Sequence, residues 1–173
     1  MKFLLRFSDG IDTISQKVGV VCSYLIVPLT LVVVYEVLSR FFNHPTIWSF
    51  ELSNFFYGTY FMLVAAYGLL YKSHVAIDLV SSHFKKKTQA VLSLICYLFM
   101  YFPFIAVFLY FGVSYAANSW QMMEKSWSIW GPPIYPFKTV IPITALMLLL
   151  QGISEVIKTL AVLIPEGGES HES

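Results

Sequence analysis

Residues 88–123 read TQAVLSLICYLFMYFPFIAVFLYFGVSYAANSWQMM and contain no charged residue. A helix rises about 1.5 Å per residue and needs about 20 mostly apolar residues to cross the hydrocarbon core of a bilayer. Three further stretches are also free of charge: residues 18–35, 52–71 and 139–154. The last is a little short, and we expect its helix to continue through Glu155 to Leu163. The sequence therefore predicts four transmembrane helices.

The composition also indicates a membrane protein. Hydrophobic residues make up 57% of the 173 residues, and charged residues make up 12%, about half of the roughly 25% found in soluble domains. The net charge of +1 gives no general field that would attract nucleic acid. The apolar stretches are continuous and lack the two-residue alternation of a membrane β-barrel. We therefore expect an all-α integral membrane protein.

The positions of the basic residues predict the topology. Lys and Arg concentrate before the first span and between the second and third, and Lys158 lies near the end of the fourth, so the positive-inside rule places both termini in the cytoplasm. The apolar run after Val18 is long enough to span, and we expect this N-terminal region to be retained. The expected segments are an amphipathic interfacial segment at 1–17, transmembrane helices at 18–38, 51–71, 91–116 and 135–163, periplasmic loops at 39–50 and 117–134, a cytoplasmic interfacial loop or helix at 72–90, and a disordered acidic tail at 164–173.

Prolines and cysteines within the expected spans have structural interpretations. Pro28, Pro103 and Pro142 each leave one backbone carbonyl without its helical donor, which predicts bends near these positions. Cys22 and Cys96 have no metal-ligand spacing, and we expect them to be small apolar fillers.

The histidines argue against a haem-binding membrane anchor. Such an anchor needs two histidines on facing helices at matching depth. His44 lies in an expected outer loop, His74 and His83 lie in the inner loop, and His171 lies in the tail. The sequence also has no nucleophile with a base partner, no glycine-rich phosphate loop and no suitably spaced pair of carboxylates. We therefore expect no enzyme activity, no cofactor and no bound metal.

Glu36 is the only carboxylate in the first apolar segment and opens an alternative interpretation. Small four-helix multidrug exporters work by protonating one glutamate in their first helix, and an ionisable residue in a membrane is a candidate functional site. Arg40 follows one turn later, which favours an ion pair at the outer end of this helix. The alternatives are thus an autonomous proton-coupled exporter using Glu36, or a haem-free anchor subunit of another complex.

A specific order of residues begins with RFFNHPTIWSFEL at 40–52 and ends with YKSHVAIDL at 71–79. Its members are Arg40, Trp48, Glu51, a helix with Gly58, Ala65, Ala66 and Gly68, and then His74, Val75 and Asp78. This order resembles the small membrane subunit of tripartite ATP-independent periplasmic (TRAP) transporters, the Q subunit or DctQ-like family. One position departs from the family pattern, because Phe50 stands where a first glutamate is common.

The resemblance implies a heteromeric complex in a bacterial inner membrane. Its other members would be a large multi-helix permease, the M subunit, and a soluble periplasmic binding protein, the P subunit, that delivers an organic anion. The large subunit would carry the sodium and substrate sites, while the small subunit would brace its static scaffold and contact membrane lipids. We expect no substrate site and no nucleic-acid contact in this chain.

Polar and small residues are the candidate contacts of such a subunit. Arg40, Trp48 and Glu51 would form an outer anchor, in which Arg40 bridges Glu51 or pairs with the partner. On the inner side, His74 and Asp78 lie one turn apart and would fix a short interfacial helix. Small residues of the second span would allow close packing with another helix: Gly58, Ala65 and Gly68.

The loop at 117–134 has two interpretations. Its aromatic residues favour a belt at the membrane surface: Trp120, Trp127, Trp130 and Tyr135. Glu124 and Lys125 lie on the expected periplasmic side and give a second hypothesis, in which this loop docks the binding protein.

Overall fold

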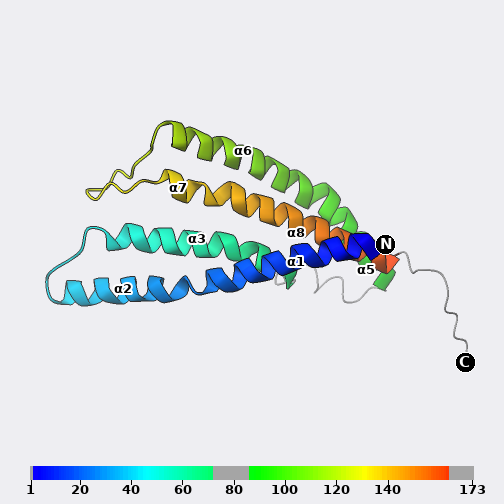
Figure 1. Cartoon of the computed structure of the whole chain (residues 1–173), viewed down its shortest axis with the longest axis horizontal. Coiled ribbons are helices and arrows are strands. Elements are labelled where there is room, and N and C mark those ends of the chain that lie inside the picture. The colour runs from blue at the N-terminus through cyan, green and yellow to red at the C-terminus, as the bar shows by residue number, and fades with distance from the viewer. Residues whose placement is uncertain (1, 72–85, 164–173) are drawn as a thin grey trace, which may run out of the picture.

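The computed structural model describes residues 2–71 and 86–163 and contains a bundle of long helices (Figure 1). Its elements are α1 (Lys2–Ser23), α2 (Ile26–Phe41), α3 (Ser49–Leu70), α5 (Lys86–Cys96), the π-helical turn η1 (Tyr97–Tyr101), α6 (Phe102–Gln121), α7 (Tyr135–Lys138) and α8 (Val140–Leu163). Within the described ranges the chain forms no strand, only a single bridge between Lys125 and Pro133. The expected all-α class is confirmed. Residues 72–85 of the inner loop and the tail at 164–173 lie outside the described residues.

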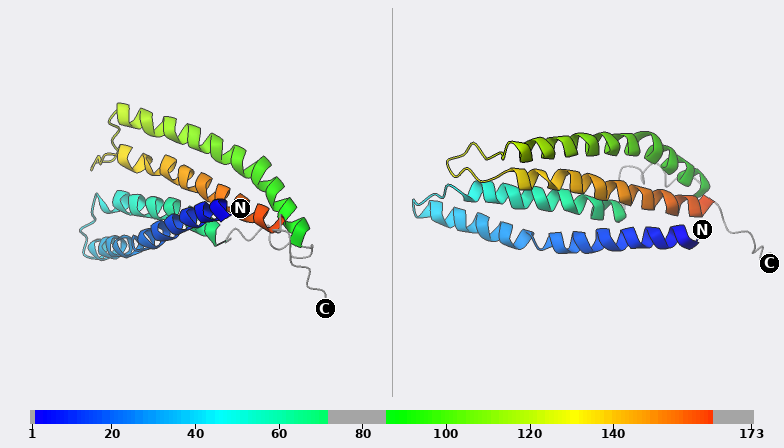
Figure 2. Two further views of the ribbon diagram at one scale, coloured as in Figure 1. Left: turned by 45° about the vertical axis from the view of Figure 1, so that its right-hand side comes forward. Right: turned by 45° about the horizontal axis from the view of Figure 1, so that its top comes forward.

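Two central helices organise the bundle. α8 packs against α1, α3 and α6, and α3 packs against α1, α2 and α8. α1 and α2 follow one another along one side of the bundle, and α6 lies along the opposite side (Figure 1, Figure 2). The loops 42–48 and 122–134 lie at one end, which we call the loop end. The N-terminus and the last turns of α8 lie at the other end, which we call the terminal end.

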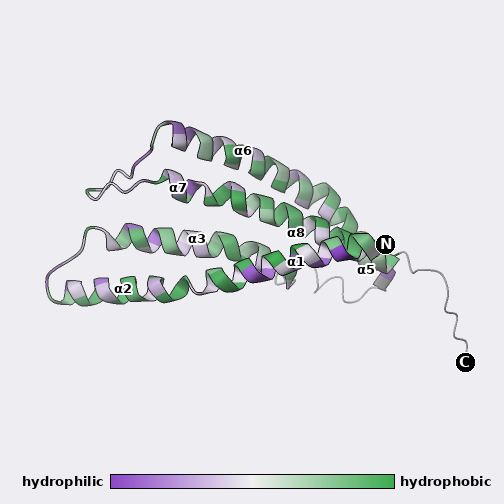
Figure 3. Ribbon diagram, in the orientation of Figure 1, coloured by the Kyte–Doolittle hydropathy of each residue, from purple (hydrophilic) through white to green (hydrophobic). Residues whose placement is uncertain are grey.

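The packing is inverted relative to a water-soluble bundle. Buried side chains are mostly small or polar, among them Ala66, Ala145, Ser8, Ser119 and Ser154. Large apolar side chains are exposed along the helices, and Figure 3 shows hydrophobic residues over most of α6 and α8. Exposure of so many large apolar side chains is favourable in hydrocarbon and unfavourable in water. In the part of the chain that the structure describes, three helical stretches are long and apolar enough to cross a membrane: residues 3–41, 87–121 and 135–161.

α3 has the length of a membrane-spanning helix but is more polar than these three stretches. It contains 22 residues, and its sequence SFELSNFFYGTYFMLVAAYGLL includes Glu51, Asn54 and several tyrosines. Its hydropathy does not reach that of the other three stretches. The fourth membrane crossing therefore stays a prediction.

Helix irregularities precede the three prolines that were expected to cause bends. α1 and α2 are separated by a two-residue turn just before Pro28, inside the span expected at 18–38. η1 precedes Pro103, and α7 ends four residues before Pro142. The carbonyl four residues before each proline has no helical donor, because proline lacks an N–H. At Pro28 the result is a turn that divides the expected helix, which is more than a bend.

Two glycines allow the helices to approach closely. A methyl group at Gly152 of α8 would lie 2.3 Å from Cε1 of Tyr101, whose hydroxyl donates a hydrogen bond to the Leu148 carbonyl at 2.7 Å. A methyl group at Gly19 of α1 would lie 2.4 Å from the Tyr67 ring of α3. Both tyrosines occupy the space that a side chain would need, so these contacts fix α8 against η1 and α1 against α3.

We expect Gly152→Ala to destabilise the bundle. The added methyl group would displace Tyr101 and weaken its hydrogen bond to Leu148, and overpacking of this kind costs about 1–3 kcal/mol. Thermal unfolding of the purified protein, followed by reaction of the buried Cys22 thiol with a fluorescent dye, measures the change. Gly10→Ala is the matched control, because a methyl group there meets no atom within 4 Å. An unchanged melting temperature for Gly152→Ala would contradict the close packing.

Candidate functional site

A polar cluster at the loop end joins α2 to α3. Glu36, near the end of α2, accepts hydrogen bonds from Arg40 Nε at 2.5 Å and from Ser49 Oγ at 2.7 Å. The hydroxyl and the backbone N–H of Thr46 also donate to Glu36, the N–H at 3.3 Å. The Glu36 side chain is 12% exposed, whereas that of Arg40 is 66% exposed. The predicted Glu36–Arg40 ion pair is confirmed, and the same carboxylate closes the loop 42–48 onto α3.

Trp48 holds the same loop through an aromatic contact. Its indole stacks on Tyr35 of α2, with ring centroids 5.7 Å apart and an interplanar angle of 24°. The bridge from Arg40 to Glu51, one of two options for the outer anchor, is not formed. Arg40 instead binds Glu36, which lies one turn away on its own helix and is reached without crossing the loop.

Glu51 connects the beginning of α3 to the second loop. Its Oε1 accepts a short hydrogen bond from Ser126 Oγ, 75 residues along the chain. The backbone of this loop is itself fixed, because the Ser126 N–H donates to the Pro132 carbonyl at 2.9 Å and Gly131 adopts a φ of +59°, which favours glycine. Glu51 therefore ties the beginning of α3 to the loop 122–134.

Glu124 and Lys138 form an ion pair beside this loop. Glu124 Oε2 lies 2.5 Å from Lys138 Nζ and accepts a hydrogen bond from Ser119 Oγ at 2.7 Å. Lys138 is buried, and its Nζ lies 4.0 Å from the centroid of the Tyr115 ring. Hydrogen bonds from Lys138 and Ser119 hold the pKa of Glu124 below its ordinary value, although burial raises it. Glu124 is thus engaged within the chain while Lys125 is exposed, and their role in docking stays a prediction.

A second polar cluster lies between α1 and α8, nearer the terminal end. Asp12 Oδ2 lies 2.6 Å from Lys158 Nζ, which also lies 2.9 Å from Glu155 Oε1. Asp12 Oδ1 accepts hydrogen bonds from Gln151 Nε2 at 2.9 Å and from Ser154 Oγ at 2.8 Å. Gln151, Ser154 and Glu155 are buried. A carboxylate of α1 is therefore held by three side chains of α8.

Two serines of α1 complete this arrangement. The hydroxyl oxygens of Ser8 and Ser154 lie 2.6 Å apart, and Ser15 Oγ donates to Gln151 Oε1 at 2.7 Å. Both α1 serines are buried. We call these residues the α1–α8 cluster: Ser8, Asp12, Ser15, Gln151, Ser154, Glu155 and Lys158.

The α1–α8 cluster is not among the contacts predicted from the sequence. Residues 1–17 were expected to form an interfacial segment and not to pair with the fourth span. The available signal was the spacing of polar residues within an apolar pattern. In both helices they recur three or four residues apart, which places them on one face: Ser8, Asp12 and Ser15 in α1, and Gln151, Ser154, Glu155 and Lys158 in α8.

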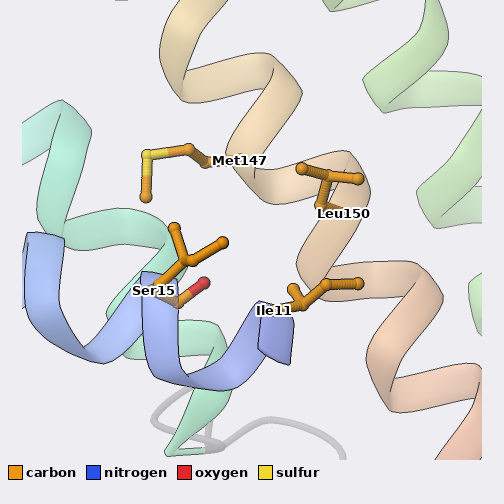
Figure 4. A pocket seen from close by; sticks show the side chains of 5 residues that line it. Ile11, Ser15, Met147 and Leu150 are labelled. Atoms are coloured by element: carbon orange, nitrogen blue, oxygen red, sulfur yellow. The ribbon is translucent and has the colours of Figure 1, made fainter. Parts of the chain in front are cut away.

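A small apolar hollow lies beside the cluster. Figure 4 shows Ile11 and Ser15 of α1 facing Met147 and Leu150 of α8 across it. The hydroxyl of Ser15, its polar lining group, is already hydrogen bonded within the α1–α8 cluster. A ligand site needs convergent polar groups that fix its ligand. The hollow is therefore interpreted as a packing gap between α1 and α8.

The predicted close-packing residues of α3 divide into two kinds. Gly58 is used within the chain, because a methyl group there would lie 2.5 Å from Cζ of Phe137 in α7. Ala65 is partly exposed, and a methyl group at Gly68 would meet no described atom within 4 Å. One of the three predicted positions thus contributes to the packing of this subunit, and Gly68 opens outward.

The predicted inner contacts, His74 and Asp78, lie outside the described residues. In the part of the chain that the structure describes, no three His, Cys, Asp or Glu side chains gather in a group that could hold a metal ion. Cys22 is a buried free thiol, and Cys96 is a partly buried one.

Long apolar helices, held together by polar contacts inside the bundle, define a multi-pass α-helical membrane protein. The family model for the DctQ component of tripartite ATP-independent periplasmic transporters matches residues 29–162. The chain belongs to this family, which confirms the resemblance seen in residues 40–79. It is thus the component of a transporter and not a member of an enzyme family. In a comparison with curated proteins, no match to the chain was found.

Lys158→Met should destabilise the protein by removing the cation between Asp12 and Glu155. Breaking a fully buried pair costs about 3–5 kcal/mol, and the partial exposure of Lys158 lowers the expected loss to about 1–3 kcal/mol. Thermal unfolding measures the loss, and a double-mutant cycle with Asp12→Asn isolates the pair. Lys17→Met, on the exposed side of α1, should have little effect. If the two substitutions at Lys158 and Asp12 were simply additive, the pair would contribute nothing.

Glu124→Gln should remove a contribution to stability that depends on pH. The pKa of Glu124 is lowered in the folded state, so the ionised carboxylate favours folding. This contribution is fully present above the unfolded-state pKa of about 4.3 and is lost as the pH falls through the lower folded-state pKa. The melting temperatures of the wild type and the variant should therefore differ at pH 7 and begin to converge as the pH falls below about 4.3. A difference that stays constant down to pH 3 would contradict the role of this carboxylate, and Lys125→Gln serves as the control.

Proposed function

We propose that the chain is the small membrane subunit of a tripartite transporter and braces the scaffold of the large permease subunit. The complex takes up an organic anion that a periplasmic binding protein delivers, and a sodium gradient drives the uptake. The match of residues 29–162 to the DctQ component supports this function. The chain carries no substrate site of its own in this proposal.

The surroundings of the acidic side chains are the observation on which the proposal depends. Glu36, Glu124 and Asp12 are each bound by a basic side chain and by at least one hydroxyl group of the same chain. A transport pathway needs polar groups that can exchange partners with a solute or an ion. These three carboxylates instead hold one helix or loop against another, as expected of a subunit that braces a scaffold.

The proposed topology places α3 in the membrane as a fourth span. The distribution of Lys and Arg favours the terminal end in the cytoplasm and the loop end in the periplasm of a bacterial inner membrane. α3 is contacted by α1, α2 and α8, so less of its surface would meet lipid than in a peripheral helix. A helix in this central position needs less hydropathy to be stable in the membrane.

The exporter alternative is not favoured by the contacts of Glu36. A carboxylate that couples protons to transport must bind and release protons beside the solute pathway. Glu36 instead accepts hydrogen bonds from Arg40, Thr46 and Ser49 and closes a loop at the end of α2.

Uptake should require this chain and the large permease together. Cells that lack both subunits would receive the permease, this chain or both, always with the binding protein. The transported anion is the one that co-purifies with the binding protein and is identified by mass spectrometry. We expect uptake only when both subunits are present and, in proteoliposomes, only with an inward sodium gradient.

Two outcomes of this experiment would contradict the proposal. The first is full uptake by the permease without this chain, which would remove the bracing role. The second is sodium-driven accumulation of the anion by liposomes that contain this chain alone, which would give it a pathway of its own.

A further inference from the structure

One face of α3 has no partner among the described residues of the chain. Its exposed or partly exposed positions form a line along the helix: Phe50, Asn54, Tyr57, Phe61, Val64 and Gly68. We call this line the α3 stripe. Phe50, Tyr57 and Phe61 are 70%, 56% and 65% exposed. The other sides of α3 pack against α1, α2 and α8.

The spacing of the α3 stripe is that of a seam between two helices. Its successive members lie alternately four and three residues apart from Phe50 to Gly68. This alternation keeps the side chains on one narrow line and is the pattern by which two helices pack at a small crossing angle. The stripe therefore has the geometry to receive a single further helix.

Gly68 is a second and independent observation. A methyl group at Gly19, Gly58 or Gly112 would lie 2.4, 2.5 or 3.2 Å from a side chain of another helix. At Gly68 a methyl group would meet no described atom within 4 Å. Gly10 is open as well, but it lies in the charged first half of α1 and not on an apolar line. Glycine weakens a helix, and its usual benefit in a membrane is the close approach of another helix.

The chemistry of the α3 stripe fits another membrane helix. The stripe carries no charge, and the stacked rings of Tyr57 and Phe61, with centroids 6.0 Å apart, form a ridge near the middle of α3. Val64 and Gly68, nearer the terminal end, have a small side chain or none, so the stripe protrudes less there. α3 is also less apolar than the three most hydrophobic stretches. Contact with another protein helix is therefore more favourable for α3 than contact with lipid.

From these observations we infer that the α3 stripe is the surface that packs against one transmembrane helix of the large permease subunit, with the closest approach at Gly68. The inference rests on the proposed function, because that function supplies the large apolar partner. It adds the face through which the small subunit is joined to the scaffold.

Photocrosslinking from Phe61 tests this surface. p-Benzoylphenylalanine replaces Phe61 in the full chain, which is co-expressed with the large permease and irradiated in membranes. The same replacement at Phe111 of α6 is the matched control, because Phe111 is 64% exposed and Phe61 is 65% exposed. We expect an adduct with the permease from position 61 and none from position 111. Adducts from position 61 with lipid only, or with a second copy of this chain, would overturn the inference.

Gly68→Leu tests the close approach. A methyl group at position 68 would meet no described atom of this chain within 4 Å, so we expect the isolated subunit to keep its melting temperature. We expect the amount of permease that co-purifies at limiting concentration to fall about tenfold, equivalent to about 1.4 kcal/mol of binding. Ala106→Leu, on the exposed surface of α6, should leave co-purification unchanged. Equal behaviour of the two variants would overturn the inference.

The outcomes separate a failure of this surface from a failure of the proposed function. If the wild-type chain does not co-purify with the permease, the proposed function fails. If the wild-type chain does co-purify, while the crosslinks arise from Phe111 and Gly68→Leu has no effect, the proposed function stands and only the α3 stripe is the wrong surface.

Discussion

The structure depends on the need of polar groups in a membrane to find partners inside the protein. An unpaired polar side chain in hydrocarbon costs several kcal/mol, so such groups turn inward and apolar side chains turn outward. Asp12 and Gln151 meet this need between α1 and α8, where each satisfies the other and the neighbouring serines. The buried interior is accordingly made of small and polar residues, and the aromatic and branched residues cover the outside.

Separate sets of contacts fix the two ends of the bundle. At the loop end, Glu36 joins α2 to α3, Glu51 joins α3 to the loop 122–134, and Glu124 joins this loop to Lys138 of α7. Toward the terminal end, the α1–α8 cluster connects the first helix to the last. Between the two ends, Gly19 of α1 lies close to the ring of Tyr67 in α3, and this contact is made by carbon atoms. These contacts oppose relative movement of the helices, which the proposed bracing role requires.

Local couplings could be predicted from the sequence, and distant couplings could not. The all-α class followed from the charge-free stretches, and the Glu36–Arg40 pair followed from a spacing of four residues within one helix. The contact of Gly58 with Phe137 and the partners of Asp12 depend on how helices are placed side by side. That placement is set by packing across the whole bundle, and a pattern along one helix shows only that a face is small or polar. The division of the first span near Pro28 was larger than the expected bend because proline frees a carbonyl but does not fix how the chain responds.

The α1–α8 cluster also sets an order for the biogenesis of the protein. Ser8 and Ser154 are 146 residues apart, so the ribosome makes the polar face of α1 long before the face that satisfies it. Until α8 emerges, Asp12 and its neighbouring serines have to stay in contact with water, lipid headgroups or the insertion machinery. The helix that is synthesised first can therefore reach its final place only after the helix that is synthesised last. A chain truncated before Gln151 would lack the α8 side chains of the cluster, and the polar face of α1 would then have no partner there.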